Sequence, residues 1–194
     1  LPCNVQNPGE LEAVFDTIKQ RWGQLDFVLH SIAFAPSVDL HEPLINSSPD
    51  GFLMAMDVSC HSFIRMSRLA APLMTDGGSL FAMSYYGAEK VVENYDLMGP
   101  VKSALEGSVR YLASELGQHG IRVYCISPGP VKTRASSGLK SFDKLMSDTI
   151  SRTPTQRLAT IADIGKATAL MATPAAKMIT GETIFIDGGH HIMG

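Results

Sequence analysis

The feature that most constrains the fold is the alternation of short, continuously apolar segments with amphipathic stretches. The apolar segments read "LDFVLHSIAFA", "GGSLFAMS", "IRVYCISPGP" and "GETIFIDGG". Between them, apolar residues recur at the three-and-four spacing of a helix face, as in Leu11, Val14, Phe15, Ile18 and Trp22, or in Leu105, Val109, Leu112 and Leu116. Strands without polar alternation are typical of a parallel sheet covered by helices on both faces. The sequence therefore predicts an α/β fold with a doubly wound parallel sheet.

Local signals give provisional boundaries for these elements. Asn7 is expected to cap the first helix with Pro8 at its first position, and Gly23 to end it. Thr160 and Asp163 predict a capping box for a helix that runs to about Ala172. Residues 50–74 are helical in tendency, and "LPCNV" at the start is interpreted as the end of a strand.

Length and composition fit one globular domain. The chain has 194 residues, and hydrophobic residues make up 45% of it, which is enough for a sizeable core. A net charge of -3 without a basic cluster argues against a nucleic-acid partner. Three scattered cysteines, no apolar run of membrane-spanning length and no leader-like start predict a soluble cytoplasmic protein without a membrane partner, although a leader lost upstream stays open.

Each predicted strand ends in small or polar residues. Ligands of parallel sheets bind beyond the carboxyl ends of the strands, so we expect the site at that edge. The four strand ends are Ser31-Ile32-Ala33, Ser84-Tyr85, Ser127-Pro128-Gly129 and Asp187-Gly188-Gly189.

A tyrosine and a lysine follow the second of these strands at a suggestive spacing. Pro100 is tolerated only in a first helical turn, which predicts a helix that begins between Asn94 and Leu97. Tyr95 and Lys102 are seven positions apart, about two turns, so they would project from the same side. A cation there would favour the phenolate and make the phenol a better proton donor. On spacing alone, a partly buried tyrosine and a solvated helix lysine are the more common explanation, since such pairs are not rare.

The surrounding motifs carry a family resemblance. The order "SYYGAE…NYDLMGPVK…RYLASELG…GIRVYCISPGPVKT…SG…ITGETIFIDGG" resembles the bacterial NADH-dependent enoyl-acyl carrier protein reductases over essentially all of the chain. This family is a divergent branch of the short-chain dehydrogenase/reductase superfamily. Ordinary members of the superfamily place the tyrosine four residues before the lysine, where this chain has Met98. They also have a serine where it has Tyr85.

The resemblance implies a Rossmann-type fold and a reaction. The reaction is reduction of a trans-2-enoyl thioester on acyl carrier protein, the last step of each fatty acid elongation cycle. Tyr95 would hydrogen-bond the thioester oxygen, Lys102 would hold the nicotinamide ribose, and Tyr85 would border and orient the substrate. NADH is the expected cofactor, with NADPH left open, and a homotetramer is the expected assembly.

The resemblance also implies binding residues. Those expected at the cofactor are Asn4, Val5, Ile32, Lys102, Val131, Lys132, Thr133, Arg134 and Ala135. Those expected at the substrate are Ala35, Tyr85, Tyr95, Phe142 and Met146. Within a single domain over residues 1–194, residues 135–150 match the substrate-binding segment of the family. Simple core packing of a short helix explains Phe142 and Met146 equally well.

The chain departs from the family pattern at its start. The first β-α-β portion, with its glycine-rich phosphate turn, is not found in these residues. Part of a longer protein, a genuine truncation and an inactive remnant all remain open. The rival functions are a short-chain carbonyl or alcohol reductase and a non-catalytic Rossmann fragment. The adjacent pair His190-His191 has no helical ligand spacing, so we expect no metal site.

Overall fold

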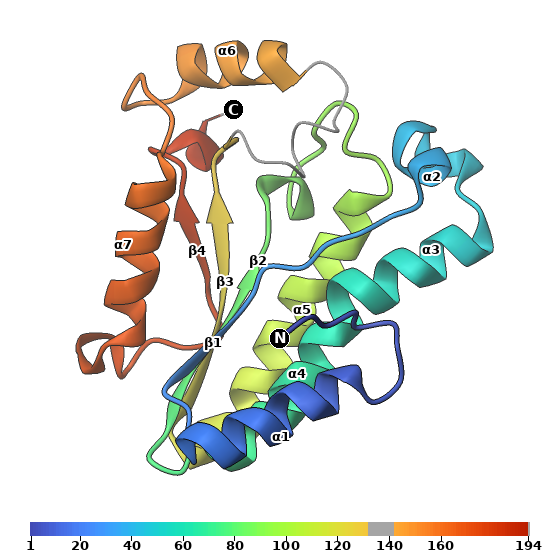
Figure 1. Ribbon diagram of the computed structural model, residues 1–194. Coiled ribbons are helices and arrows are strands. Elements are labelled where there is room, and N and C mark those ends of the chain that lie inside the picture. The colour runs from blue at the N-terminus through green and yellow to red at the C-terminus, as the bar shows by residue number, and fades with distance from the viewer. Residues whose placement is uncertain (132–141, 194) are drawn as a thin grey trace.

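The computed structural model describes residues 1–131 and 142–193 and contains a sheet of four parallel strands (Figure 1). The strands are β1 (Phe27–His30), β2 (Gly78–Met83), β3 (Ile121–Pro128) and β4 (Thr183–Ile186), and their order in the sheet follows the chain. The register pairs Leu80 with Val28 and with Val123. The predicted parallel sheet is therefore confirmed, as is each of the four apolar segments as a strand.

Helices cover both faces of this sheet. They are α1 (Glu10–Trp22), α2 (Ser37–His41), α3 (Pro49–Met56), α4 (Ser62–Ala70), α5 (Met98–Leu116), α6 (Phe142–Arg152) and α7 (Ile161–Ala172). A π turn over Asp57–His61 joins α3 to α4. Figure 1 shows α1, α4 and α5 on one face, α7 on the other, and α6 beyond the carboxyl ends of β3 and β4. This arrangement leaves the carboxyl edge of the sheet as the place where loops from several elements meet.

Alternate residues of the central strands supply two cores. On the face of α5, Leu80 and Val123 belong to the larger cluster, together with Phe63 of α4. On the opposite face, Phe81 stacks on Tyr124 with ring centroids 5.3 Å apart, and Met171 of α7 packs against them. Side chains of successive strand residues point to opposite faces, so strands that are apolar throughout serve both cores.

The boundaries of two helices follow their local signals. Thr160 accepts a hydrogen bond from the Asp163 amide, and the Asp163 carboxylate accepts one from the Thr160 amide, which completes the predicted capping box of α7. Gly23 ends α1 with a φ of 79°, in the left-handed region that favours glycine.

The prediction for the start of the chain was wrong in two details. The N-cap of α1 is Gly9, because the Asn7 side chain donates to Glu10 instead of capping the helix. Residues 1–4 form no strand: the Asn4 amide donates to the Glu10 carboxylate and the Asn4 side chain accepts from Gln6. These local bonds take the place of sheet pairing.

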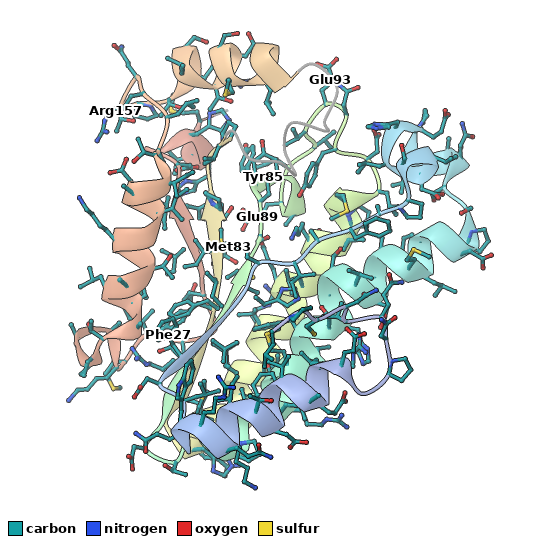
Figure 2. The ribbon with its side chains drawn as sticks, in the orientation of Figure 1. Phe27, Met83, Tyr85, Glu89, Glu93 and Arg157 are labelled. Carbon is teal, nitrogen blue, oxygen red and sulfur yellow. The ribbon has the colours of Figure 1, made fainter. Side chains whose placement is uncertain are left out.

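Strand β1 forms one edge of the described sheet. Phe27, labelled in Figure 2, is 57% exposed and Leu29 is 45% exposed. Within residues 1–131 and 142–193 no further strand pairs with β1 on its outer side.

Across the same residues, no helix has the length and apolar character that a membrane span requires. All three cysteines are free thiols; Cys60 and Cys125 are buried, whereas Cys3 is exposed.

Gly77 offers a test of how the sheet is assembled. It enters β2 with a φ of 78°, and a Cβ added there would lie 2.6 Å from the Gly120 carbonyl oxygen. We expect Gly77→Ala to lower the free energy of unfolding by about 2 kcal/mol or more, because left-handed strain and a backbone clash add. Urea unfolding followed by circular dichroism measures this change.

Gly165→Ala is the matched control. Gly165 lies on α7 with no atom within 4 Å of an added Cβ. Alanine should therefore stabilise the protein by roughly 0.5–1 kcal/mol through helix propensity. Equal effects of the two substitutions would contradict this account of the turn.

Candidate functional site

The site is centred on the carboxyl end of β2. Figure 2 shows Met83 and Tyr85 at this end of the strand. Helix α5 packs against the sheet there and buries Lys102, which is 5% exposed. The Lys102 ammonium donates a hydrogen bond of 2.7 Å to the Met83 carbonyl oxygen. A residue that spacing alone allowed to be a solvated helix lysine is thus a buried cation at the edge of the sheet.

Tyr95 reaches the same place from a turn and not from the helix. The prediction that Tyr95 and Lys102 share a helix was wrong, because α5 begins at Met98. Asn94 and Asp96 have φ values of 61° and 32°, so the chain on both sides of Tyr95 is in positive-φ conformations that no helix contains. The two residues are linked through β2, since Tyr95 contacts Tyr85 and Lys102 contacts Met83, two residues earlier.

The Tyr95 ring rests on two neighbours. It meets the Tyr85 ring edge-on, with centroids 4.9 Å apart and an interplanar angle of 62°. It also lies against Gly87, where an added Cβ would be 2.4 Å from Tyr95 Cδ1. A residue larger than glycine at position 87 would therefore displace the phenol. The 3₁₀ turn over Tyr86–Ala88 brings this glycine under the ring.

Burial dominates the electrostatics of these side chains. It raises the pKa of Tyr85 to about 12 and raises that of Tyr95 well above its usual value, while it lowers the pKa of Lys102 to about 8. Glu106 also raises the pKa of Tyr95. The expectation that a nearby cation would favour the phenolate was wrong for this state, because burial raises the pKa of both phenols. Both phenols are therefore neutral and carry a hydroxyl proton that can be donated in a hydrogen bond.

A buried carboxyl group beneath the site was missed by the sequence analysis. The Ser84 hydroxyl donates to Glu106 Oε1 over 2.5 Å, and both residues are buried. Glu106 follows Lys102 by one helical turn on α5, and this four-residue spacing is the signal that could have revealed it. Ser84 stands between Met83 and Tyr85, so the bond fixes the strand end that carries the site.

The loop after β1 brings two predicted residues to this region. Ala35 is buried in an apolar cluster with Leu97, Met98 and Val101, against which Tyr95 packs. Ile32 is half-buried in the same loop. Ser59 fixes the loop by accepting a hydrogen bond from the Phe34 amide and donating one to the Phe34 carbonyl.

The remaining predicted residues are placed only in part. Asn4 is exposed and Val5 is buried near the start of the chain. Val131 follows β3 and is half-buried. Lys132, Thr133, Arg134 and Ala135 lie outside the described residues. Of the expected substrate segment, residues 142–150 belong to α6, which begins at Phe142 and half-buries Met146.

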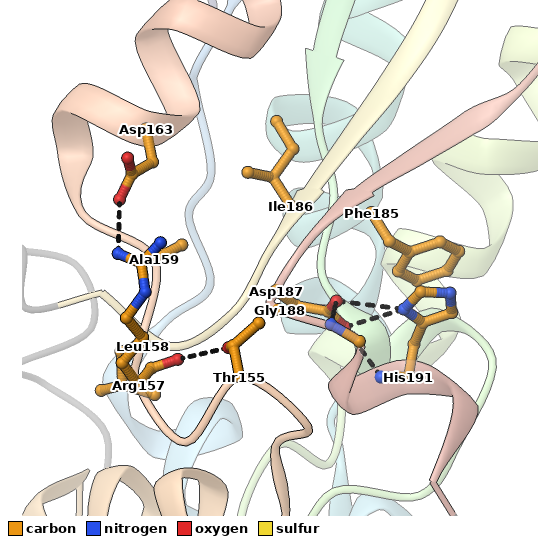
Figure 3. A pocket seen from close by; sticks show the side chains of 11 residues that line it. Thr155, Arg157, Leu158, Ala159, Asp163, Phe185, Ile186, Asp187, Gly188 and His191 are labelled. Atoms are coloured by element: carbon orange, nitrogen blue, oxygen red, sulfur yellow. Dashed lines mark hydrogen bonds and ion pairs between the residues drawn. The ribbon is translucent and has the colours of Figure 1, made fainter.

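A separate hollow of about 400 Å³ lies at the end of β4 (Figure 3). Its walls include Thr155, Arg157, Phe185 and His191. The Asp187 carboxylate accepts hydrogen bonds from the Gly189 amide, the His191 amide and His191 Nδ1, the last at 3.0 Å. The sequence led us to consider only His190 and His191, as metal ligands; the Asp-x-x-x-His spacing of Asp187 and His191 was the available signal for this bond. Residues 1–131 and 142–193 hold no cluster of three possible metal ligands.

The chemistry of the donor set suits a nicotinamide cofactor. An ammonium carries three N–H bonds, and within the described residues one of those of Lys102 is used, by Met83. The other two have no partner among these residues and are available to a ligand at the carboxyl edge. Ser127 Oγ at the end of β3 is buried, and no described residue bonds to it, so this edge offers a further polar group.

Comparisons with known proteins agree with this site. A family model described as "Enoyl-(Acyl carrier protein) reductase" matches residues 1–191. The NADH-dependent enoyl-[acyl-carrier-protein] reductase FabI of Bacillus cereus is 43% identical over 194 residues, which cover 100% of this chain and 76% of that protein.

The solved structures that this chain resembles are also enoyl-acyl carrier protein reductases. The B. cereus enoyl-acyl carrier protein reductase, crystallised with NADP+ and indole naphthyridinone, superposes with a TM-score of 0.97 at 43% identity over 100% of this chain and 76% of that one. The reductase of Anaplasma phagocytophilum, in complex with NAD, has a TM-score of 0.95 at 42% identity over 100% of this chain and 74% of that one. With a family model over nearly its whole length and a tyrosine pair beside a buried lysine at the end of β2, this chain belongs to the enoyl-acyl carrier protein reductase family.

Proposed function

We propose that the protein reduces trans-2-enoyl-acyl carrier protein to acyl-acyl carrier protein with NADH, the last step of fatty acid elongation. The observation that carries this proposal is the convergence of Tyr85, Tyr95 and Lys102 on the carboxyl end of β2 in a chain of this family. The direct experiment mixes the protein with NADH and a trans-2-enoyl thioester and follows the loss of NADH absorbance. No oxidation above that of a Tyr95→Phe variant would count against the proposal.

Tyr95 is the residue that stabilises the developing charge. When bound, NADH supplies the hydride that reduces the double bond. Negative charge then develops on the thioester oxygen of the substrate. A neutral, buried phenol is suited to donate a hydrogen bond to that oxygen, because such a bond is strongest in a site from which water is excluded. The raised pKa keeps the proton on Tyr95 across the physiological pH range.

Lys102 binds the cofactor and sets the local charge. Its two available N–H donors would bind the nicotinamide ribose, and its ammonium raises the potential near the substrate oxygen. Tyr85 contacts the Tyr95 ring edge-on and so limits how that ring can rotate. We assign Tyr85 the role of orienting the substrate beside Tyr95.

The other predicted binding residues are assigned to the cofactor or to the acyl chain. Ile32, Val131 and the segment from Lys132 to Ala135 would line the cofactor, with Asn4 and Val5 at its adenine end. For Asn4 this requires a change, since its side-chain oxygen now accepts from Gln6. Ala35, Phe142 and Met146 would contact the acyl chain, with residues 135–150 as the substrate-binding segment. The acyl carrier protein would deliver that chain as the partner.

The rival activity is carbonyl or alcohol reduction. It requires a tyrosine at position 98, but Met98 is 6% exposed and belongs to an apolar cluster. A thioether there cannot donate a proton to a substrate oxygen. Turnover of simple ketones or aldehydes at a rate above that of enoyl thioesters would favour the rival.

Tyr95→Phe tests the catalytic assignment. We expect kcat to fall by about a hundredfold or more, as is usual when a proton donor is removed, while the dissociation constant for NADH stays near that of the parent. Tyr111→Phe is the matched control, since Tyr111 lies on α5 and is 76% exposed. Steady-state kinetics and fluorescence titration with NADH supply both numbers. A variant that keeps full kcat would remove Tyr95 from the chemistry.

Lys102→Ala tests the cofactor assignment. The affinity for NADH should fall about tenfold to a hundredfold, because charged hydrogen bonds to the ribose are lost. In the parent protein, affinity should also decline as the pH rises through about 8, where the Lys102 ammonium loses its proton. Lys166→Ala, on the exposed face of α7, should change neither quantity. Unaltered NADH affinity in Lys102→Ala would place the lysine outside the cofactor site.

The assembly is tested separately. We propose a homotetramer on the basis of the family resemblance. Light scattering during size-exclusion chromatography should give a particle of four chains at the concentration used for activity. A monomer with full activity would refute this assignment.

A further inference from the structure

Glu106 is a buried charge that the proposed reaction does not use. It lies on α5 one turn after Lys102 and is 6% exposed. Its carboxyl group accepts a hydrogen bond from the Ser84 hydroxyl. A buried carboxyl group costs free energy unless other groups compensate for its lost hydration, and the Ser84 hydroxyl is one such group.

The bond to Ser84 connects Glu106 to the site. Ser84 is the residue between Met83, whose carbonyl holds the Lys102 ammonium, and Tyr85, whose ring supports Tyr95. Movement of Ser84 would therefore shift both contacts together. Helix α5 carries Lys102 and Glu106 on the same face, so the helix contacts the end of β2 through two side chains, at Met83 and at Ser84.

Charge gives a second connection. Burial lowers the pKa of Lys102, and Cys125, Cys60 and Glu106 oppose that shift by raising it. Burial raises the pKa of Glu106 and so does Glu89, while the hydrogen bond from Ser84 and the nearby Arg110 lower it. The other titratable groups that face Lys102 are Cys60 before α4, Cys125 of β3 and His30 of β1. Of all these neighbours, Glu106 is the one carboxyl group within the described residues that faces the ammonium.

We propose that Glu106 is a positioning residue of the site: through Ser84 it fixes the end of β2 that carries Met83 and Tyr85, and it supplies the negative charge that faces Lys102. The catalytic consequence of this role rests on the proposed function, whereas the effect of Glu106 on Lys102 does not. The carboxylate touches neither substrate nor cofactor. It acts by keeping the ammonium charged and the strand end in place.

The test compares Glu106→Gln with the parent protein. Glutamine removes the charge and keeps an oxygen that accepts from Ser84. The readout is the ¹³C shift of Lys102 Cε in protein with labelled lysine, assigned with Lys102→Ala and followed against pH without NADH. We expect the midpoint of the Lys102 titration to move to lower pH than the value of about 8 in the parent. The loss of NADH affinity relative to the parent should then grow as the pH rises.

Two further variants make the result decisive. Glu115→Gln changes an exposed carboxylate on the same helix and should leave the Lys102 midpoint unchanged. Glu106→Asp keeps the charge and should restore most of the midpoint, which also covers the case in which Glu106→Gln does not fold. An unmoved midpoint in Glu106→Gln, or an equal shift in Glu115→Gln, would overturn the inference. A moved midpoint with no NADH binding at any pH would instead count against the proposed function alone.

Discussion

The hydrogen bond from the Lys102 ammonium to the Met83 carbonyl is the interaction on which the site depends. It joins the 19-residue helix α5 to the end of a central strand, in surroundings from which water is largely excluded. A buried ammonium is tolerated only where acceptors and opposite charge offset its lost hydration. The Met83 carbonyl supplies the acceptor, and Glu106 supplies the charge from the next turn of the helix. The lysine is therefore part of how the helix and the strand fit together as well as a site residue.

The same constraint decides how the two tyrosines are placed. Because β2 ends where Lys102 holds it, Tyr85 leaves the strand in an extended conformation, and the chain then turns back at Gly87. That glycine leaves room for the Tyr95 ring, which a Cβ would fill. The phenol is thus held by a strand end, a glycine and a neighbouring ring from different parts of the chain. Burial of both rings, in turn, keeps both phenols protonated.

The sequence was informative where structure depends on neighbours along the chain. The capping box at Thr160 and Asp163 needs four consecutive residues, and the strands show in their apolar runs. It was uninformative where distant segments decide. The position of Tyr95 depends on Gly87 and on the positive φ values of Asn94 and Asp96, which no periodicity signals. Asn7 had the residue type of a cap, but a competing bond to Glu10 takes its side chain. The Ser84–Glu106 bond spans 22 residues, and the sequence hints at it only through the four-residue spacing of Lys102 and Glu106.

The place of Met98 explains why the tyrosine stands outside the helix. Position 98 is the first of α5, four residues before Lys102, and its side chain is buried with Leu97, Val101, Ala35 and Ala55. A phenol there would put a polar hydroxyl into an apolar cluster without an obvious partner, at a cost of about 1–3 kcal/mol. With methionine in the cluster, the phenol comes from Tyr95, which packs against the outside of the same cluster and meets Tyr85. One apolar cluster thus packs against the loop after β1, the start of α5 and the tyrosine. A change in the packing of any one of these three would therefore shift the side chains of the other two.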